Sequence, residues 1–213
     1  MESAVPTKKR QRLSRERVLD AAITLARADG LAGVSMPSVS RSLGTTPMSL
    51  YRWVENKDAL VLGMLARATG MVEVPTPRND PTKEIMGVFG AIHDMLRQDP
   101  WTVQHFLQGY RGSEPVRALV SRSLTALTGL GLEPGEAWRA HQALLRYTYG
   151  EVLALQASAK DGLDYDALDH VPTEADETIR EFEDAAVADK SDERYRETLK
   201  RYLRSVLAEV GAD

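Results

Sequence analysis

Apolar residues recur along this chain at intervals of three and four positions, the spacing that lines one face of an α-helix. The first such stripe consists of Leu19, Ala22, Ile23 and Ala26, and similar stripes continue almost to the C-terminal end. No stretch alternates apolar and polar residues as a half-buried strand does. The pattern therefore predicts an all-α protein.

Within residues 14–72 the predicted helices are short, and specific residues mark the breaks between them. Gly30 ends the first helix, and Gly44 ends the second because glycine enters the left-handed conformation at little cost. The third helix begins beside Pro47, and Asn56 is expected to cap the fourth. A helix, a tight turn and a second helix form a helix-turn-helix unit, which places its second helix in the major groove of DNA.

The run from Arg17 to Leu65 resembles the DNA-binding domain of the TetR family of bacterial transcriptional regulators. The resemblance rests on RVLDAAITLARADGLAGVSM, on the turn Ser42-Leu43-Gly44 and on SLYRWVENKDAL, and it covers roughly the first third of the chain. It implies an N-terminal three-helix helix-turn-helix domain that binds DNA. It also implies a C-terminal helical domain that binds a small ligand and dimerises.

Outward helical phase and the pattern of the family together predict which residues contact DNA. The set is Ser35, Thr45, Thr46, Pro47, Met48, Ser49, Tyr51, Arg52 and Lys57. Those expected to face base edges are Thr46, Met48, Ser49 and Arg52. Tyr51 and Lys57 are expected to hold phosphates, since Lys57 lies in the first turn of a helix, where N–H groups also attract anions.

The chain is predicted to divide into a basic arm (1–13), a helix-turn-helix DNA-binding domain (14–72), a linker (73–81) and a helical effector-binding and dimerisation domain (82–213). The linker holds three prolines, which break helicity. The arm carries four Lys and Arg residues within positions 8–12. Such an arm can lie along phosphates or reach a minor groove, and a plain disordered tail is the alternative.

Composition and charge narrow the class of protein. The chain has no cysteine, which excludes disulfides, thiolate catalysis and sulfur-ligated zinc. Its net charge of −4 combines +5 over residues 1–70 with −9 over residues 71–213. A basic head on an acidic body fits a protein that meets phosphate with one end. No apolar run approaches ~20 residues and no signal-peptide pattern is present, so a cytoplasmic protein without a membrane partner is expected.

The second domain is expected to be helical throughout. Helices are predicted near 85–96, 101–109, 113–129, 134–160 and 192–210, with an acidic loop at 161–173 followed by a weaker helix that carries Ile179 and Phe182. The helix at 134–160 bears large apolar residues around most of its girth, and such a helix needs partners on more than one side.

A second copy of the chain is one candidate partner for that helix, because soluble homo-oligomers are mostly two-fold dimers. The resemblance implies the same arrangement, with two helices from each subunit forming a four-helix bundle. The residues predicted at this interface are Leu144, Val152, Leu155, Tyr202 and Val206. The alternative is that the long helix is buried within one subunit.

A ligand site is predicted inside the second domain, where three helices bring together aromatic and imidazole side chains. Its predicted residues are Phe89, His93, Phe106, Tyr110, Trp138, His141 and Leu145. Apolar walls with a few polar groups are typical of small-molecule sites, so the effector is expected to be apolar and aromatic or polycyclic, without a metal or cofactor. The alternative is that these side chains simply fill the core.

The predicted function is that of a ligand-responsive transcriptional repressor, which binds a palindromic operator as a homodimer and is released by a small effector. The sequence holds no HExxH, GxSxG, P-loop or GxGxxG motif, and its four histidines lack close metal spacing, so no enzyme is expected. One alternative is a helical small-molecule-binding or catalytic protein whose helix-turn-helix is only structural. Another is an architectural DNA-bending protein, against which the large acidic body argues.

Overall fold

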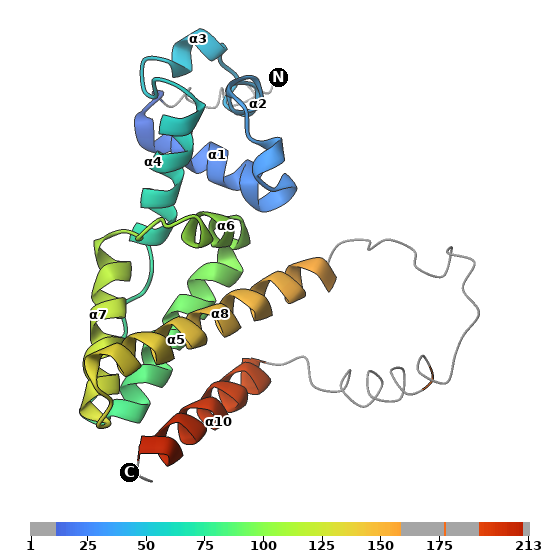
Figure 1. Cartoon of the computed structure of the whole chain (residues 1–213). Coiled ribbons are helices and arrows are strands. Elements are labelled where there is room, and N and C mark those ends of the chain that lie inside the picture. The colour runs from blue at the N-terminus through green and yellow to red at the C-terminus, as the bar shows by residue number, and fades with distance from the viewer. Residues whose placement is uncertain (1–11, 159–176, 178–191, 211–213) are drawn as a thin grey trace, which may run out of the picture. The chain divides into compact units, whose positions relative to one another are not determined.

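A computed structural model of the chain describes residues 12–158, Glu177 and residues 192–210 (Figure 1). Regular structure in this part of the chain is helical, which confirms the predicted all-α fold. The predicted acidic loop at 161–173 and the helix around Ile179 and Phe182 lie outside the described residues. None of the described helices has both the length and the apolar character that a membrane span requires. The chain forms two compact units, Met1–Met71 and Val72–Asp213.

The first unit consists of helices α1 (Arg15–Asp29), η1 (Leu31–Gly33), α2 (Met36–Ser42), α3 (Pro47–Leu50) and α4 (Lys57–Gly70). Helix α1 packs against both α2 and α4. A Cβ atom at Gly63 of α4 would lie 2.8 Å from Leu19 Cδ2, so the absence of a side chain there lets the two helices approach closely. Asp20 of α1 also forms a bidentate ion pair with Arg67 of α4, in which Arg67 Nη2 lies 2.9 Å from Asp20 Oδ2.

Side chains cap helices α1, α2 and α4 of the first unit. Ser14 Oγ accepts a hydrogen bond from Arg17 N at 3.3 Å, and Asn56 Oδ1 accepts one from Ala59 N at 2.8 Å. Ser35 and Ser38 exchange hydrogen bonds as a capping box at the start of α2. Each cap satisfies N–H groups that the first helical turn leaves without partners, which fixes where the helix begins.

The second unit consists of helices α5 (Pro81–Gln98), η2 (Pro100–Thr102), α6 (Val103–Leu107), α7 (Glu114–Gly129), α8 (Pro134–Ser158) and α10 (Asp192–Val210). Helix α5 packs against α7, α8 and α10. The single helix expected at 101–109 is instead a 3₁₀ turn followed by a short α-helix. Pro100 lacks an N–H group, and Thr102 N donates at 2.9 Å to Asp99 O, which starts the segment as a tighter turn.

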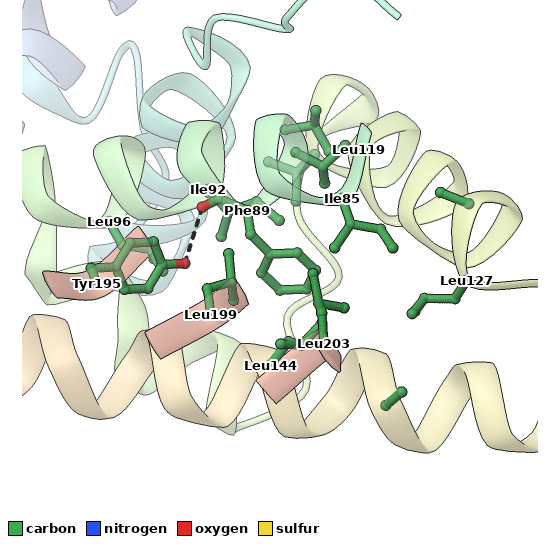
Figure 2. Close-up of a cluster of buried hydrophobic side chains, with 14 of the residues drawn as sticks. Ile85, Phe89, Ile92, Leu96, Leu119, Leu127, Leu144, Tyr195, Leu199 and Leu203 are labelled. Atoms are coloured by element: carbon green, nitrogen blue, oxygen red, sulfur yellow. Dashed lines mark hydrogen bonds between the residues drawn. The ribbon is translucent and has the colours of Figure 1, made fainter. Parts of the chain in front are cut away.

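Phe89 lies at the centre of the second unit's core, among leucine and isoleucine side chains of several helices (Figure 2). Its own carbonyl group is also engaged, since Tyr195 of α10 donates its hydroxyl to Phe89 O at 3.2 Å. The same hydroxyl lies 2.9 Å from Thr148 Oγ1 of α8. Burial raises the pKa of Tyr195, which keeps the phenol protonated as these hydrogen bonds require. This buried network therefore joins α5, α8 and α10.

A partly buried ion pair holds the chain segment that leads into α5. Glu84 of α5 is only 7% exposed, and its Oε1 accepts a hydrogen bond from Arg122 Nε of α7 at 2.6 Å. Its Oε2 accepts one from Arg78 N at 2.8 Å, while Arg122 Nη1 donates to Pro75 O at 2.7 Å. The linker is thus fixed to α5 and α7. The hydrogen bond from Arg122 holds the pKa of Glu84 below its usual range.

We expect Glu84→Gln to lower the free energy of unfolding by about 1–2 kcal/mol at neutral pH, because it removes charge-assisted hydrogen bonds. The folded-state pKa lies below the unfolded value, so ionised Glu84 contributes stability above the unfolded pKa and loses it as the pH falls through the folded one. Urea unfolding of parent and variant from pH 7 to about pH 3 measures this difference.

The difference is expected to shrink at the acidic end of that range. Glu73→Gln, at an exposed position of the same segment, serves as the matched control and should leave the free energy of unfolding nearly unchanged. A Glu84→Gln deficit that stayed constant with pH would contradict the assignment of the ion pair.

Candidate nucleic-acid interface and effector site

The turn between α2 and α3 is built around Gly44, whose φ is +61°. Gly44 N donates to Arg41 O at 3.1 Å, and Thr45 N donates to Ser40 O at 2.9 Å, so the turn closes directly on the end of α2. A side chain in this left-handed conformation would be strained. Gly44 therefore forms the turn that follows the end of α2, as the sequence predicts.

Helix α3 is anchored on one side and open to solvent on the other. Leu50 and Val54 are buried beneath it. Met48 is 76% exposed, an unusual state for a large apolar side chain that suggests a surface covered by a partner. The exposed members of the predicted DNA-contacting set are Thr46, Pro47, Met48, Tyr51, Arg52 and Lys57. The structure thus brings a polar and aromatic surface together around one helix and its following turn.

The three other residues predicted to contact DNA are half-buried. Ser49 is half-buried, and its hydroxyl lies 3.0 Å from Thr46 Oγ1. Ser35 is half-buried too, and its side chain caps α2 by accepting from Ser38 N at 3.2 Å. Thr45 is half-buried within the turn. Contacts of Ser35 and Thr45 with DNA stay predictions. A DNA contact by Ser35 would use a side chain that also caps α2.

Two exposed side chains beside this surface were not in the predicted set. Arg41 lies in the last turn of α2, and Trp53 lies in the turn that follows α3. Arg41 is not among the buried residues of α2. Its helical phase, which points away from Val39, could have identified it in the sequence as a candidate phosphate contact. Trp53 belongs to the Tyr51-Arg52-Trp53 run, and its 38% exposure is visible only in the structure.

In the second unit, the structure places two of the predicted ligand-site residues, Phe89 and Trp138, beside a third, His141. The ring of Phe89 lies 5.5 Å from the His141 ring, and the ring of Trp138 lies 6.0 Å from it in a stacked orientation. His141 is 1% exposed, whereas Trp138 is 50% exposed. Burial lowers the pKa of His141 to about 4, so the imidazole is neutral at pH 7.

The other predicted ligand-site residues fall into separate groups. His93 is buried and stacks on Tyr195, with ring centroids 3.9 Å apart. Phe106 contacts Tyr110 at 5.6 Å and Tyr149 at 6.2 Å between ring centroids. Leu145 is half-buried against the core. Phe106 and Leu145 nevertheless pack against the same core as Phe89, and a single ligand site formed by all seven residues stays a prediction.

Two polar groups beside these rings escaped the sequence prediction. Ser123 Oγ of α7 lies 2.7 Å from His141 Nδ1 of α8. Tyr195 of α10 stacks on both His93 and Tyr147. Both contacts join residues on different helices, and helical phase alone carries no information about such pairings.

The predicted dimer contacts need one correction. Leu144 and Val152 are each only 1% exposed and lie within the core of their own protomer, so they present no surface to a second copy. The face of α8 that carries Leu144 and Val152 is covered by helices of the same chain. Leu155 is half-buried, Tyr202 is 37% exposed, and the side chain of Val206 lies outside the described residues.

Comparison with known proteins finds a similar sequence and several similar solved structures. No model of a known protein family matches the chain. Over 99 residues, or 43% of this chain, it is 37% identical to the HTH-type transcriptional repressor DrrR1 of Streptomyces coeruleorubidus. The matched stretch is 35% of DrrR1, so the chain spans about a third of that protein's length.

Solved structures match over most of the chain. ActR of Streptomyces coelicolor, a TetR family protein in complex with actinorhodin, has a TM-score of 0.69 at 20% identity, covering 93% of this chain and 97% of ActR. BioQ of Mycobacterium smegmatis has a TM-score of 0.66 at 19% identity, covering 92% and 99% of the two chains. BioQ with its double-stranded DNA operator also matches, with a TM-score of 0.58 at 20% identity over 68% and 88%. The chain therefore has the fold of the TetR-family transcriptional regulators.

Proposed function

We propose that this chain is a ligand-responsive transcriptional repressor that binds a palindromic DNA operator as a homodimer. The observation that carries this proposal is the exposed surface of α3, which Gly44 orients and which Leu50 and Val54 anchor from below. The net charge of +5 over residues 1–70 supplies the attraction to phosphate that such a surface needs. DrrR1 is named a repressor and BioQ binds an operator, which supports the same function here.

In this proposal α3 enters the major groove. Met48 and Arg52 face base edges, where Arg52 is suited to pair with a guanine. Tyr51 and Lys57 hold the phosphates beside them, and these contacts set the register of the helix. A single unit reads only a few base pairs, so two copies on an inverted repeat are required for selectivity.

Dimerisation is assigned to the exposed sides of α8 and α10. Leu153 and Tyr202 are large apolar side chains that remain exposed in one protomer, unlike the buried Leu144 and Val152. A surface of this kind on two long helices fits a four-helix interface between two copies.

We expect Tyr202→Glu to convert the dimer to monomers and to weaken operator binding at least about tenfold, since a charge would be buried at the interface. Sedimentation at micromolar concentration measures the first effect, and DNA titration measures the second. Lys200→Glu, on the other side of the buried stripe formed by Tyr195, Leu199 and Leu203, is the matched control and should stay dimeric. A parent protein that sediments as a monomer would rule out the dimer.

The effector is proposed to bind in the second unit, beside the rings around His141. ActR, which shares the fold, has been solved with actinorhodin, and this supports a small-molecule site in the present chain. A ligand that releases DNA must bind the DNA-incompetent state more tightly, and DNA must weaken the ligand by the same factor.

Selection from a random library of DNA duplexes with the full chain tests the proposal. An inverted repeat with half-sites about one helical turn apart, or a multiple of it, is the expected product. The alternative, a helical binding or catalytic protein with a purely structural helix-turn-helix, predicts no enriched sequence.

A further inference from the structure

The two ring nitrogens of His141 have different surroundings. Nδ1 lies 2.7 Å from Ser123 Oγ, whereas Nε2 is buried and has no hydrogen-bond partner among the described residues. The side chain is 1% exposed, so bulk water does not satisfy Nε2 either. A buried polar atom without a partner is rare in folded proteins and marks a place where a partner is missing.

The hydrogen bonds of Ser123 decide which nitrogen of His141 carries the proton. Ser123 Oγ donates to Val120 O at 2.9 Å, and a hydroxyl has only one proton. Both contacts of Ser123 are hydrogen bonds only if His141 Nδ1–H is the donor to Ser123 Oγ. A neutral imidazole protonated at Nδ1 has a lone pair at Nε2, so the buried Nε2 of His141 is a hydrogen-bond acceptor.

The ring partners of His141 are aromatic and uncharged. Phe89 packs at a tilt to the imidazole ring, and Trp138 stacks on it. No charged side chain is among these neighbours or Ser123, so a cationic donor would be desolvated without compensation. Trp138 is 50% exposed, so it is the ring partner of His141 that a ligand can contact from solvent.

We propose that the effector is a planar aromatic molecule with a ring hydroxyl group, and that this hydroxyl donates a hydrogen bond to Nε2 of His141. The half-exposed ring of Trp138 stacks with the planar body of the ligand, the buried ring of Phe89 supports the imidazole from within the core, and His141 selects for the hydroxyl. The inference rests on the proposed regulatory function and names the chemical class of its effector. A site built to receive a hydroxyl discriminates strongly against a ligand that lacks it.

The test uses the full chain with 15N-labelled histidine and two probes, 1-naphthol and its methyl ether, 1-methoxynaphthalene. Before any probe is added, long-range 1H–15N spectra at pH 7 should show His141 protonated at Nδ1. The signal of His141 is identified by its loss in His141→Phe. Addition of 1-naphthol should shift the Nε2 resonance, and 1-naphthol should bind at least about tenfold more tightly than the ether.

His141→Phe keeps the size and the apolar character of the ring, and it should bind both probes equally. If that variant does not fold, Ser123→Ala replaces it, because loss of the Nδ1 acceptor should mix the two tautomers and reduce the preference for 1-naphthol. Protonation at Nε2 in the free parent, equal affinity for the two probes, or no binding of 1-naphthol would each overturn the proposal.

Operator binding by the parent is measured separately, without a probe. Binding to the operator with no preference between the probes would refute the effector class and leave the regulator intact. A preference for 1-naphthol without any operator binding would refute the regulator and leave the hydroxyl site intact.

Discussion

Arg52→Ala is expected to weaken operator binding by about 1–3 kcal/mol, or roughly 5- to 140-fold, and to relax the preference at one position of each half-site. Arg52 is exposed in the turn that directly follows α3, two residues after the buried Leu50. Its guanidinium presents paired donors that match the O6 and N7 acceptors of guanine. Titrations with duplexes that vary one base pair at a time measure both effects.

Lys57→Ala provides the contrast to Arg52→Ala. Lys57 lies exposed at the start of α4, where we assign it to a phosphate. Its loss should weaken all duplexes alike and reduce the slope of binding against salt by about one unit for each contact removed. Arg111→Ala, at an exposed position before α7, is the matched control and should leave operator affinity unchanged. If Arg52→Ala and Lys57→Ala both bind like the parent, α3 does not lie in the groove as proposed.

Phe89→Ala is expected to lower the free energy of unfolding of the second unit by about 3–5 kcal/mol. Figure 2 shows the Phe89 ring surrounded by Ile85, Leu144 and Leu199, and its removal would leave a cavity that these side chains cannot fill. Urea unfolding followed by circular dichroism measures the loss.

Phe89→Leu separates the cavity from the loss of the aromatic ring. Leucine keeps part of the volume, so this variant should be destabilised less than Phe89→Ala. A loss below about 1 kcal/mol for Phe89→Ala would show that the core does not depend on this ring.

Local signals in the sequence were enough to predict the helix-turn-helix. Gly44 has a conformation that favours glycine, and Asn56 caps its own helix three residues away, so neither depends on the rest of the fold. Helical phase also predicted that Tyr51 and Arg52 are exposed, although α3 ends at Leu50 and both residues lie in the turn that follows it.

Contacts between helices could not be predicted in the same way. The hydrogen bond between Ser123 and His141 joins α7 to α8, and the one between Tyr195 and Phe89 joins helices far apart in the sequence. The apolar girth of α8 indicated that it needs partners on several sides, but it did not indicate which side its own chain covers. This is why Leu144 and Val152 were assigned to a dimer interface and lie in the core.

Fluorescence anisotropy of the full chain with two labelled duplexes tests the central claim, that the surface of α3 reads a DNA sequence. One duplex carries the inverted repeat obtained by selection, and the other carries the same base pairs in scrambled order. At physiological salt the selected duplex should bind at least about 10³-fold more tightly, and Arg52→Ala should narrow that ratio. Equal affinity of the parent protein for both duplexes would contradict the account.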